Sequence, residues 1–261
     1  CNMIYIATHK KFDLPVGTGY IPLQVGAQGK EKLGYMTDAK ADTISSKNAN
    51  YCELTGLYWI WKNSEDPYKG LVHYRRYFGK SNLFNTKKYI YSYDELLEFL
   101  KKYDIVLPYR ELFLQSAKDE LMISCCTEDI FDKLRQIIDA EHHEYIEVFD
   151  RYFAGNRSVL FNMMFCRREL FDQYAEWLFS ILFALEKEVD MSVLNTYQKR
   201  LYGFLAERLL NVWVIKNQLK CKNVCVVHTE MTFPDRINLI RRRYTNGIRF
   251  WMKGRMKKEK K

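Results

Sequence analysis

Residues 70–78 read Gly-Leu-Val-His-Tyr-Arg-Arg-Tyr-Phe, an apolar run that passes directly into a histidine, two arginines and three aromatic residues. The apolar part predicts a buried strand, and its polar end lies where α/β enzymes carry their binding residues. The guanidinium groups of Arg75 and Arg76 suit a phosphate or diphosphate, because each planar group donates two hydrogen bonds to anionic oxygens. A solvated basic turn above packed aromatic rings is the alternative interpretation.

Segments typical of strands and helices alternate on both sides of this stretch. We expect strands at 3–8, 20–25, 70–73, 104–108, 159–166 and 223–228, and helices at 45–61, 93–102, 127–138, 169–188 and 195–217. Such alternation is typical of an α/β fold whose central sheet is mainly parallel and has helices on both faces. No linker precedes about residue 235, so we expect one domain over 1–235 and a tail over 236–261.

The composition is that of a globular protein, with 48% apolar residues in a chain of 261, enough for a sizeable core. Its apolar stretches are too short to span a bilayer, and no basic start followed by an apolar run marks a secretory signal, so we expect a cytoplasmic protein. Seven scattered cysteines fit reduced thiols. Cys221, Cys225 and His228 lack a second well-spaced pair of ligands, so no zinc site is predicted.

The positive charge is concentrated at the C-terminal end. Residues 241–261 hold ten basic residues and one glutamate, which accounts for the whole net charge of +9. Trp251 and other apolar residues interrupt these charges, a pattern typical of segments that lie on an anionic membrane surface. A disordered solvated tail and a nucleic-acid-binding segment are the two alternatives.

Six sequence blocks occur in a specific order along the chain. They are Tyr-Ile-Ala-Thr-His-Lys at 5–10, Tyr-Ile-Pro-Leu-Gln-Val-Gly at 20–26, Asn-Tyr-Cys-Glu-Leu-Thr at 50–55, residues 70–78, Phe-Asn-Met-Met-Phe at 161–165 and Gly-Phe-Leu-Ala-Glu-Arg-Leu-Leu at 203–210. In this order they resemble bacterial capsular and O-antigen polysaccharide glycosyltransferases long filed as a domain of unknown function, some of which are similar to galactofuranosyltransferases. The resemblance covers about residues 3–230 and implies a GT-A-like nucleotide-sugar-binding fold.

The resemblance also implies a donor site for a UDP-sugar, with galactofuranose as the sugar. The nucleotide would be held by Thr8, His9, Lys10, Gln24, Val25 and Gly26. The donor sugar or ribose would contact Asn50 and Glu53, and the diphosphate would be held by Arg75 and Arg76.

Typical GT-A enzymes place an Asp-x-Asp motif at the strand-end loop, where it holds a divalent metal on the donor diphosphate. Here that place reads His73-Tyr74-Arg75-Arg76, and no carboxylate lies between Asp66 and Asp94. The oxygen ligands that Mg²⁺ or Mn²⁺ prefers are therefore missing from this loop. We expect metal-independent transfer in which the arginines neutralise the diphosphate, with a Mg²⁺ or Mn²⁺ enzyme as the alternative. His73 is expected to act as a hydrogen-bond donor.

Inverting glycosyl transfer needs a base that takes the proton of the acceptor hydroxyl. Asp129 is the first candidate, because Thr127-Glu128-Asp129 resembles the acidic motif of GT-A enzymes at a helix start; ordinary acids at a helix N-terminus would look the same. Glu207 is the second candidate, and a buried ion pair with Arg208 would explain it equally well. The family often has two histidines before the acidic pair, whereas this chain has two cysteines, which weakens the case for Asp129.

The resemblance implies an inverting glycosyltransferase, and the basic residues 241–261 predict that it works at the inner face of the cell membrane. It would move a sugar to a lipid-linked or polysaccharide acceptor in capsule, O-antigen or exopolysaccharide synthesis, with residues 241–261 on the anionic membrane. A non-catalytic scaffold of a polysaccharide assembly complex and an RNA-binding protein are the alternatives, although no nucleic-acid partner is expected.

Overall fold

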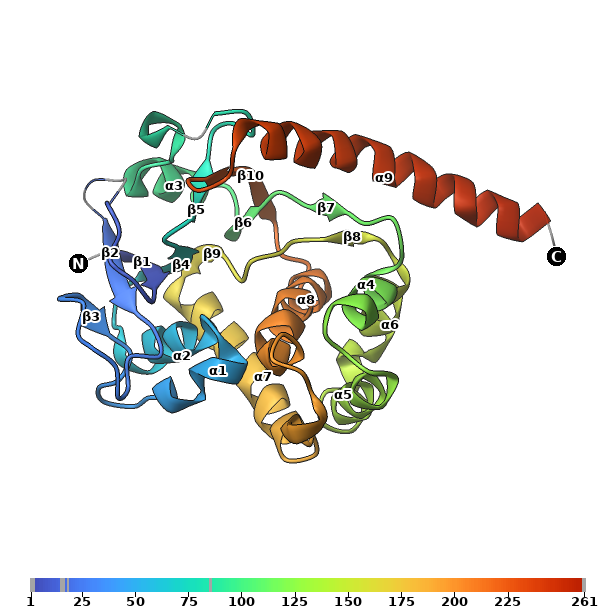
Figure 1. The fold of residues 1–261 in the computed structure, drawn as a ribbon, viewed down its shortest axis with the longest axis horizontal. Coiled ribbons are helices and arrows are strands. Elements are labelled where there is room, and N and C mark those ends of the chain that lie inside the picture. Colours follow the sequence, from blue (N-terminus) through green and yellow to red (C-terminus); the bar gives the residue numbers. More distant parts are fainter. Residues whose placement is uncertain (1–2, 15–16, 18, 85, 260–261) are drawn as a thin grey trace.

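A computed structural model describes residues 3–14, 17, 19–84 and 86–259 of the chain, and its centre is an eight-stranded sheet (Figure 1). The strands follow the order β3-β2-β1-β4-β5-β10-β6-β9, and β4 also pairs with β9. Their bounds are β1 (Met3–Thr8), β2 (Tyr20–Gln24), β3 (Met36–Thr37), β4 (Tyr68–His73), β5 (Arg76–Gly79), β6 (Ile105–Pro108), β9 (Met164–Arg167) and β10 (Cys221–His228). A separate pair consists of β7 (Glu111–Leu112) and β8 (Arg157–Ser158).

The sheet is mixed, and the prediction of a mainly parallel sheet was wrong in this respect. β1 runs parallel to β2 and β4, and β6 runs parallel to β10, but β5 and β9 are antiparallel to their neighbours. β5 turns back on β4 through Tyr74 and Arg75, with His73 opposite Arg76. Apolar periodicity marks a strand but not its direction, so this reversal had no signal in the pattern.

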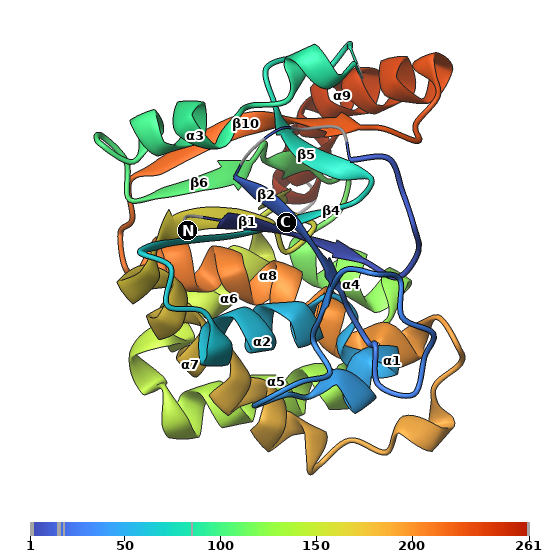
Figure 2. The same cartoon turned by 90° about the vertical axis from the view of Figure 1, so that its left-hand side faces the viewer.

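Helices cover both faces of the sheet, unequally (Figure 2). One face carries α1 (Asn48–Tyr51), α2 (Leu54–Asn63), α4 (Ala117–Ser124), α5 (Glu128–Glu141), α6 (Ile146–Ala154), α7 (Arg168–Glu186) and α8 (Leu201–Lys216). The other carries α3 (Tyr93–Phe99), and α9 (Phe233–Glu259) lies beyond β10. Side chains of β1 alternate between the two resulting cores: Tyr5 and Ala7 join the larger, Ile4 and Ile6 the smaller.

Two predicted elements are interrupted by residues with left-handed backbone angles. The helix expected over 45–61 breaks between α1 and α2, where Cys52 has a φ of 53°. The strand expected over 159–166 begins only at Met164, because Phe161 and Asn162 have φ values of 77° and 53°. Such angles are rare outside glycine and often mark functional positions, and both breaks lie beside the cavity described below.

The basic tail is part of a long helix that begins within the domain. α9 starts at Phe233 and extends past the body of the molecule (Figure 1). Arg243 is buried and donates from Nε to Glu111 Oε2 at 2.9 Å, and Asn246 donates to the carbonyl oxygen of Leu112 at 3.1 Å. Part of the predicted tail is thereby attached to the domain at β7. Lys260 and Lys261, and the side chains from residue 254 onward, lie outside the described residues.

Within the residues described, no helix combines the length and the apolar character that crossing a membrane requires.

Candidate functional site

A cavity of about 770 Å³ opens at the carboxyl ends of the parallel strands β1 and β4, beside the α1–α2 break and the first half of α8. Its position follows the rule that open α/β sheets bind ligands beyond the carboxyl ends of their strands. The side chains that could carry chemistry are Thr8, His9, Lys30, Asn48, Cys52, Glu53, His73, Arg75, Arg76, Glu120, Arg200, Glu207 and Arg208. We call it the sheet-end cavity.

A hydrogen-bonded group joins β4, the α1–α2 break and the 161–162 turn. His73 Nε2 lies 2.6 Å from the carbonyl oxygen of Phe161, so this nitrogen carries the proton and donates it. Asn162 Nδ2 donates to Glu53 Oε1 at 2.8 Å and to the Gly203 carbonyl at 3.0 Å. The turn therefore fixes both His73 and Glu53.

Burial, together with the two neighbouring arginines, lowers the pKa of His73 and favours a neutral ring. Its Nε2 lies 3.8 Å from Glu53 Oε1, which favours the protonated form, but burial has the larger effect and lowers the pKa of His73. Arg75 and Arg76 lower that pKa further. We infer that His73 serves as an oriented neutral donor at this site.

Arg76 is the more enclosed of the two adjacent arginines. Its guanidinium carbon lies 4.5 Å from the centre of the Phe161 ring, and its Nε has no hydrogen-bond partner among the described residues. Burial and the neighbouring Arg75 lower the pKa of Arg76, while Glu53 and Glu207 oppose this shift. An anion in the cavity would relieve the repulsion between these two arginines.

Glu207 is a largely buried carboxyl on α8, and its pKa is influenced by Arg76, Arg208 and Glu53. Burial raises the pKa of Glu207, and Arg208, whose Nη1 lies 3.1 Å away, opposes that shift. Glu53 raises this pKa further, whereas Arg76 and a backbone hydrogen bond at Phe161 lower it. A carboxyl with a raised pKa in a cavity is a candidate for proton transfer.

The structure brings most of the expected site residues together. Eight of them line the sheet-end cavity: Thr8, His9, Val25, Glu53, His73, Arg75, Arg76 and Glu207. They come from β1, the loop after β2, the α1–α2 break, the β4–β5 turn and α8.

Five expected site residues do not line this cavity. Gln24 bonds the backbone of Glu31 and Leu33, the N–H of Gly26 donates to Asp38, and Asn50 donates to the carbonyl oxygen of Lys199. The Gln24 side chain, the Gly26 N–H and the Asn50 side chain therefore hold neighbouring loops in place. The other two residues, Lys10 and Asp129, form ion pairs outside the cavity, with Glu230 at 3.1 Å and with Lys133 at 2.8 Å.

Asp129 therefore lacks the position expected of a catalytic base. Its side chain is 72% exposed and lies in the first turn of α5, where the dipole of the helix and Lys133 account for its presence.

Several polar residues at the site are absent from the set expected from the sequence, and Asn162, Arg200 and Arg208 are three of them. Asn162 lies inside a quoted block, and an asparagine in a strand-like run is a signal for a left-handed turn. The sequence indicates Arg208 only as an ion-pair partner of Glu207, whereas the structure also places it in the lining of the cavity. Arg200 had no local signal, because its bond from Nε to Cys52 Sγ, at 3.4 Å, joins segments 148 residues apart.

The strand-end turn, residues 73–76, carries two guanidinium groups and no carboxylate. No group of three or more histidine, cysteine or acidic side chains is placed to hold a metal within the described ranges. Of the cavity's three carboxylates, Glu53 accepts from Asn162, Glu207 pairs with Arg208 and Glu120 lies on α4. The strand-end turn offers guanidinium groups instead. Such groups bind anionic oxygens and not metal ions.

A mixed sheet with a polar, arginine-rich cavity at its parallel strand ends defines an α/β protein whose cavity has the side chains to bind an anionic ligand. The chain belongs to the family described as a domain of unknown function, DUF4422, whose sequence pattern matches residues 3–218. The apo structure of WbbM, described as a bifunctional glycosyltransferase, is similar, with 28% identity and a TM-score of 0.76. The match covers 88% of this chain and 45% of WbbM, so the chain spans less than half of that protein's length. No curated protein sequence matches the chain.

Proposed function

We propose that this protein is a glycosyltransferase that moves a sugar from a nucleotide-sugar donor to a hydroxyl of a saccharide acceptor. The observation that carries the proposal is the sheet-end cavity, which is lined by Arg75, Arg76 and the largely buried Glu207 at the carboxyl ends of β1 and β4. The similarity to a bifunctional glycosyltransferase over most of this chain supports the same class of reaction.

The donor in this proposal is a UDP-sugar, with galactofuranose as the best candidate. Thr8 and His9 would lie against the nucleotide, and Glu53, held by Asn162, would contact the sugar. Arg75 and Arg76 would bind the diphosphate and stabilise the charge it gains as it leaves. Fixed cations supply this stabilisation, so the proposed transfer requires no metal ion.

Glu207 is the proposed base. Its carboxylate would take the proton of the acceptor hydroxyl as that oxygen forms a bond to the anomeric carbon. The bond from this carbon to the diphosphate breaks at the same time, and UDP leaves with the electron pair. Attack from the side opposite the leaving group inverts the anomeric configuration. Burial makes the carboxylate more basic, which favours the proton transfer.

The acceptor in this proposal is a lipid-linked or polysaccharide chain made at the inner face of the cell membrane for capsule, O-antigen or exopolysaccharide. The basic residues of α9 would bring the enzyme to that surface, as each basic residue near an anionic leaflet contributes about 1 kcal/mol.

The test is turnover of UDP-sugars by the purified protein, after a thermal-shift screen that selects the donor, since a ligand that binds the native state raises its apparent stability. We expect the stabilisation by the donor and its turnover to be equal in EDTA and in Mn²⁺. A strict requirement for metal would contradict the role of the arginines. Donor binding without transfer or hydrolysis would favour the non-catalytic scaffold.

Replacing Arg76 with glutamine is expected to weaken UDP binding by about tenfold to a hundredfold. The loss of a charged hydrogen bond to a phosphate costs about 1.5–3 kcal/mol. Isothermal titration calorimetry measures the effect, with Arg151→Gln, an exposed residue on α6, as the control of equal charge. Equal affinities in the two variants would remove Arg76 from the donor site.

The pH dependence of kcat/KM should report Glu207. The base must be ionised, so activity is present above its pKa and is lost as the pH falls through that value. Because burial raises the pKa of Glu207, we expect the acid limb to lie above the value of about 4.3 typical of an exposed glutamate. A profile with an acid limb at or below the ordinary value would argue against Glu207 as the base.

A further inference from the structure

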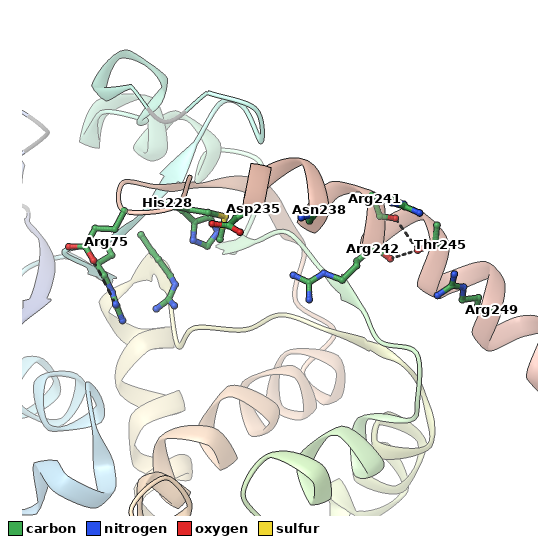
Figure 3. A pocket seen from close by; sticks show the side chains of 11 residues that line it. Arg75, His228, Asp235, Asn238, Arg241, Arg242, Thr245 and Arg249 are labelled. Carbon is green, nitrogen blue, oxygen red and sulfur yellow. Dashed lines mark hydrogen bonds and ion pairs between the residues drawn. The ribbon is translucent and has the colours of Figure 1, made fainter. Parts of the chain in front are cut away.

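A second cavity, of about 740 Å³, lies between α9 and the ends of β5 and β10, and we call it the α9 cavity (Figure 3). Arg75 and His228 lie on one side of it, and Arg241, Arg242 and Arg249 line the other along α9. Arg75 and Arg76 line both this cavity and the sheet-end cavity, so the two spaces adjoin.

The α9 cavity has an excess of positive charge. Its lining contains five arginines and two carboxylates, Glu230 and Asp235. Glu230 lies 3.1 Å from Lys10 and 3.7 Å from Arg75, and Asp235 accepts from the hydroxyl of Thr232. In the part of the chain that the structure describes, no ion pair joins Arg241, Arg242 or Arg249 to a carboxylate. Like charges that line one cavity repel one another, and an anion bound between them would relieve that repulsion.

The buried His228 side chain also favours an anion in the α9 cavity. His228 is only 8% exposed, and its Nε2 lacks a hydrogen-bond partner among the residues described. Burial and the surrounding arginines lower the pKa of His228 to about 4, so the ring is neutral near pH 7. A neutral imidazole can donate one hydrogen bond to an anionic oxygen without adding charge.

The exposed surface of α9 is apolar along one face. Its large apolar residues recur at spacings of four, seven, four and three, which places them on one side of a helix; they are Phe233, Ile237, Tyr244, Ile248 and Trp251. Each of them is between 42% and 74% exposed. Arg243 binds the domain from a different side of the helix. An apolar face flanked by arginines fits the boundary between lipid headgroups and acyl chains.

We propose that the α9 cavity binds the phosphate or diphosphate group of a membrane-anchored acceptor while the apolar face of α9 lies on the bilayer. The inference rests on the proposed glycosyl transfer and specifies how its acceptor is held. Arg241, Arg242 and Arg249 bind the phosphate oxygens, and His228 donates one further hydrogen bond. Since Arg75 and Arg76 border both cavities, the saccharide next to the bound phosphate can enter the sheet-end cavity.

Two triple variants of equal charge test the cavity. Arg241→Gln, Arg242→Gln and Arg249→Gln remove three exposed cations that line it, whereas Lys40→Gln, Lys102→Gln and Lys187→Gln remove three exposed cations elsewhere. Calorimetry with farnesyl diphosphate, in the presence of UDP, should show binding at least about tenfold weaker in the arginine variant. The lysine variant should match the wild type, and the far-UV spectrum should be the same for all.

A third variant tests the source of the phosphate. Ile237→Ser, Tyr244→Ser and Ile248→Ser remove apolar groups from the exposed face, so sedimentation with phosphatidylglycerol vesicles should fall at least about tenfold. Inorganic pyrophosphate should bind this variant as it binds the wild type, and farnesyl diphosphate should bind the wild type more tightly than pyrophosphate.

Equal binding of farnesyl diphosphate to the two triple variants of matched charge would overturn the phosphate site. Equal affinities for farnesyl diphosphate and pyrophosphate, together with vesicle binding that the serine variant leaves intact, would overturn the lipid assignment. If UDP binds neither the wild type nor any variant, the proposed donor fails, and the comparison of the arginine and lysine variants without UDP still decides the α9 cavity.

Discussion

Glu207→Gln is expected to lower kcat about a thousandfold with little change in UDP affinity. A positioned general base contributes about 10²–10⁴ to the rate, and an amide cannot accept the proton of the acceptor hydroxyl. The change keeps the shape of a side chain that is 15% exposed and lies beside Arg208. Steady-state kinetics and calorimetry on the same preparations separate the loss of chemistry from a loss of donor binding.

Two further variants sharpen this result. Glu188→Gln neutralises an exposed glutamate after α7 and serves as the control, with activity expected at the wild-type level. Asp129→Asn decides between the two bases considered from the sequence. A thousandfold loss in Asp129→Asn, with Glu207→Gln fully active, would transfer the role of the base to the first turn of α5.

Asp172→Ala is expected to lower the free energy of unfolding by about 3 kcal/mol. Lys69 lies in β4 with a side chain that is completely buried, and its Nζ donates to Asp172 Oδ1 at 2.6 Å. Removing the carboxylate leaves a buried ammonium group without its charge partner, which is a costly kind of substitution. Urea denaturation followed by circular dichroism measures the change.

The double variant Lys69→Met, Asp172→Ala tests the cause of that loss. Methionine fills much of the lysine volume without a charge, so the double variant should regain most of the stability lost in Asp172→Ala. If the double variant is as unstable as the single one, the loss arises from packing of α7 on β4 and not from an unpaired charge.

Features that depend on local sequence could be predicted. The apolar run before Thr8 and the run before His73 both form strands, and both end at the cavity, because burial of continuous apolar segments is encoded residue by residue. The helix expected to start at residue 127 begins one residue later, and Thr127 caps α5 by accepting from the N–H of Ile130 at 3.3 Å. Ser92 similarly caps α3, where Glu95 completes a capping box.

Features that depend on contacts between distant segments could not be predicted from the sequence. Asn162 meets Glu53 across 109 residues, and nothing in either segment specifies the other. Gln24 is the last residue of β2 and Gly26 lies two residues further on, beside Val25 of the cavity lining, but the hydrogen bonds of both go to neighbouring loops. Strand direction could not be predicted either, because it depends on pairing between distant segments. β9, for example, pairs antiparallel with both β4 and β6.

The place of β10 in the sheet has a consequence for how the chain folds. The last strand lies between β5 and β6, whose residues are made more than a hundred positions earlier. During synthesis β5 and β6 therefore have unpaired edges until β10 is made, and unpaired edges are sites for pairing with other chains. Contacts of such long sequence separation also slow folding. Ribosome-bound or truncated chains that end near residue 218 would contain every lining residue of the sheet-end cavity and still lack a completed sheet. Aggregation would therefore compete with folding until residues 221–228 emerge.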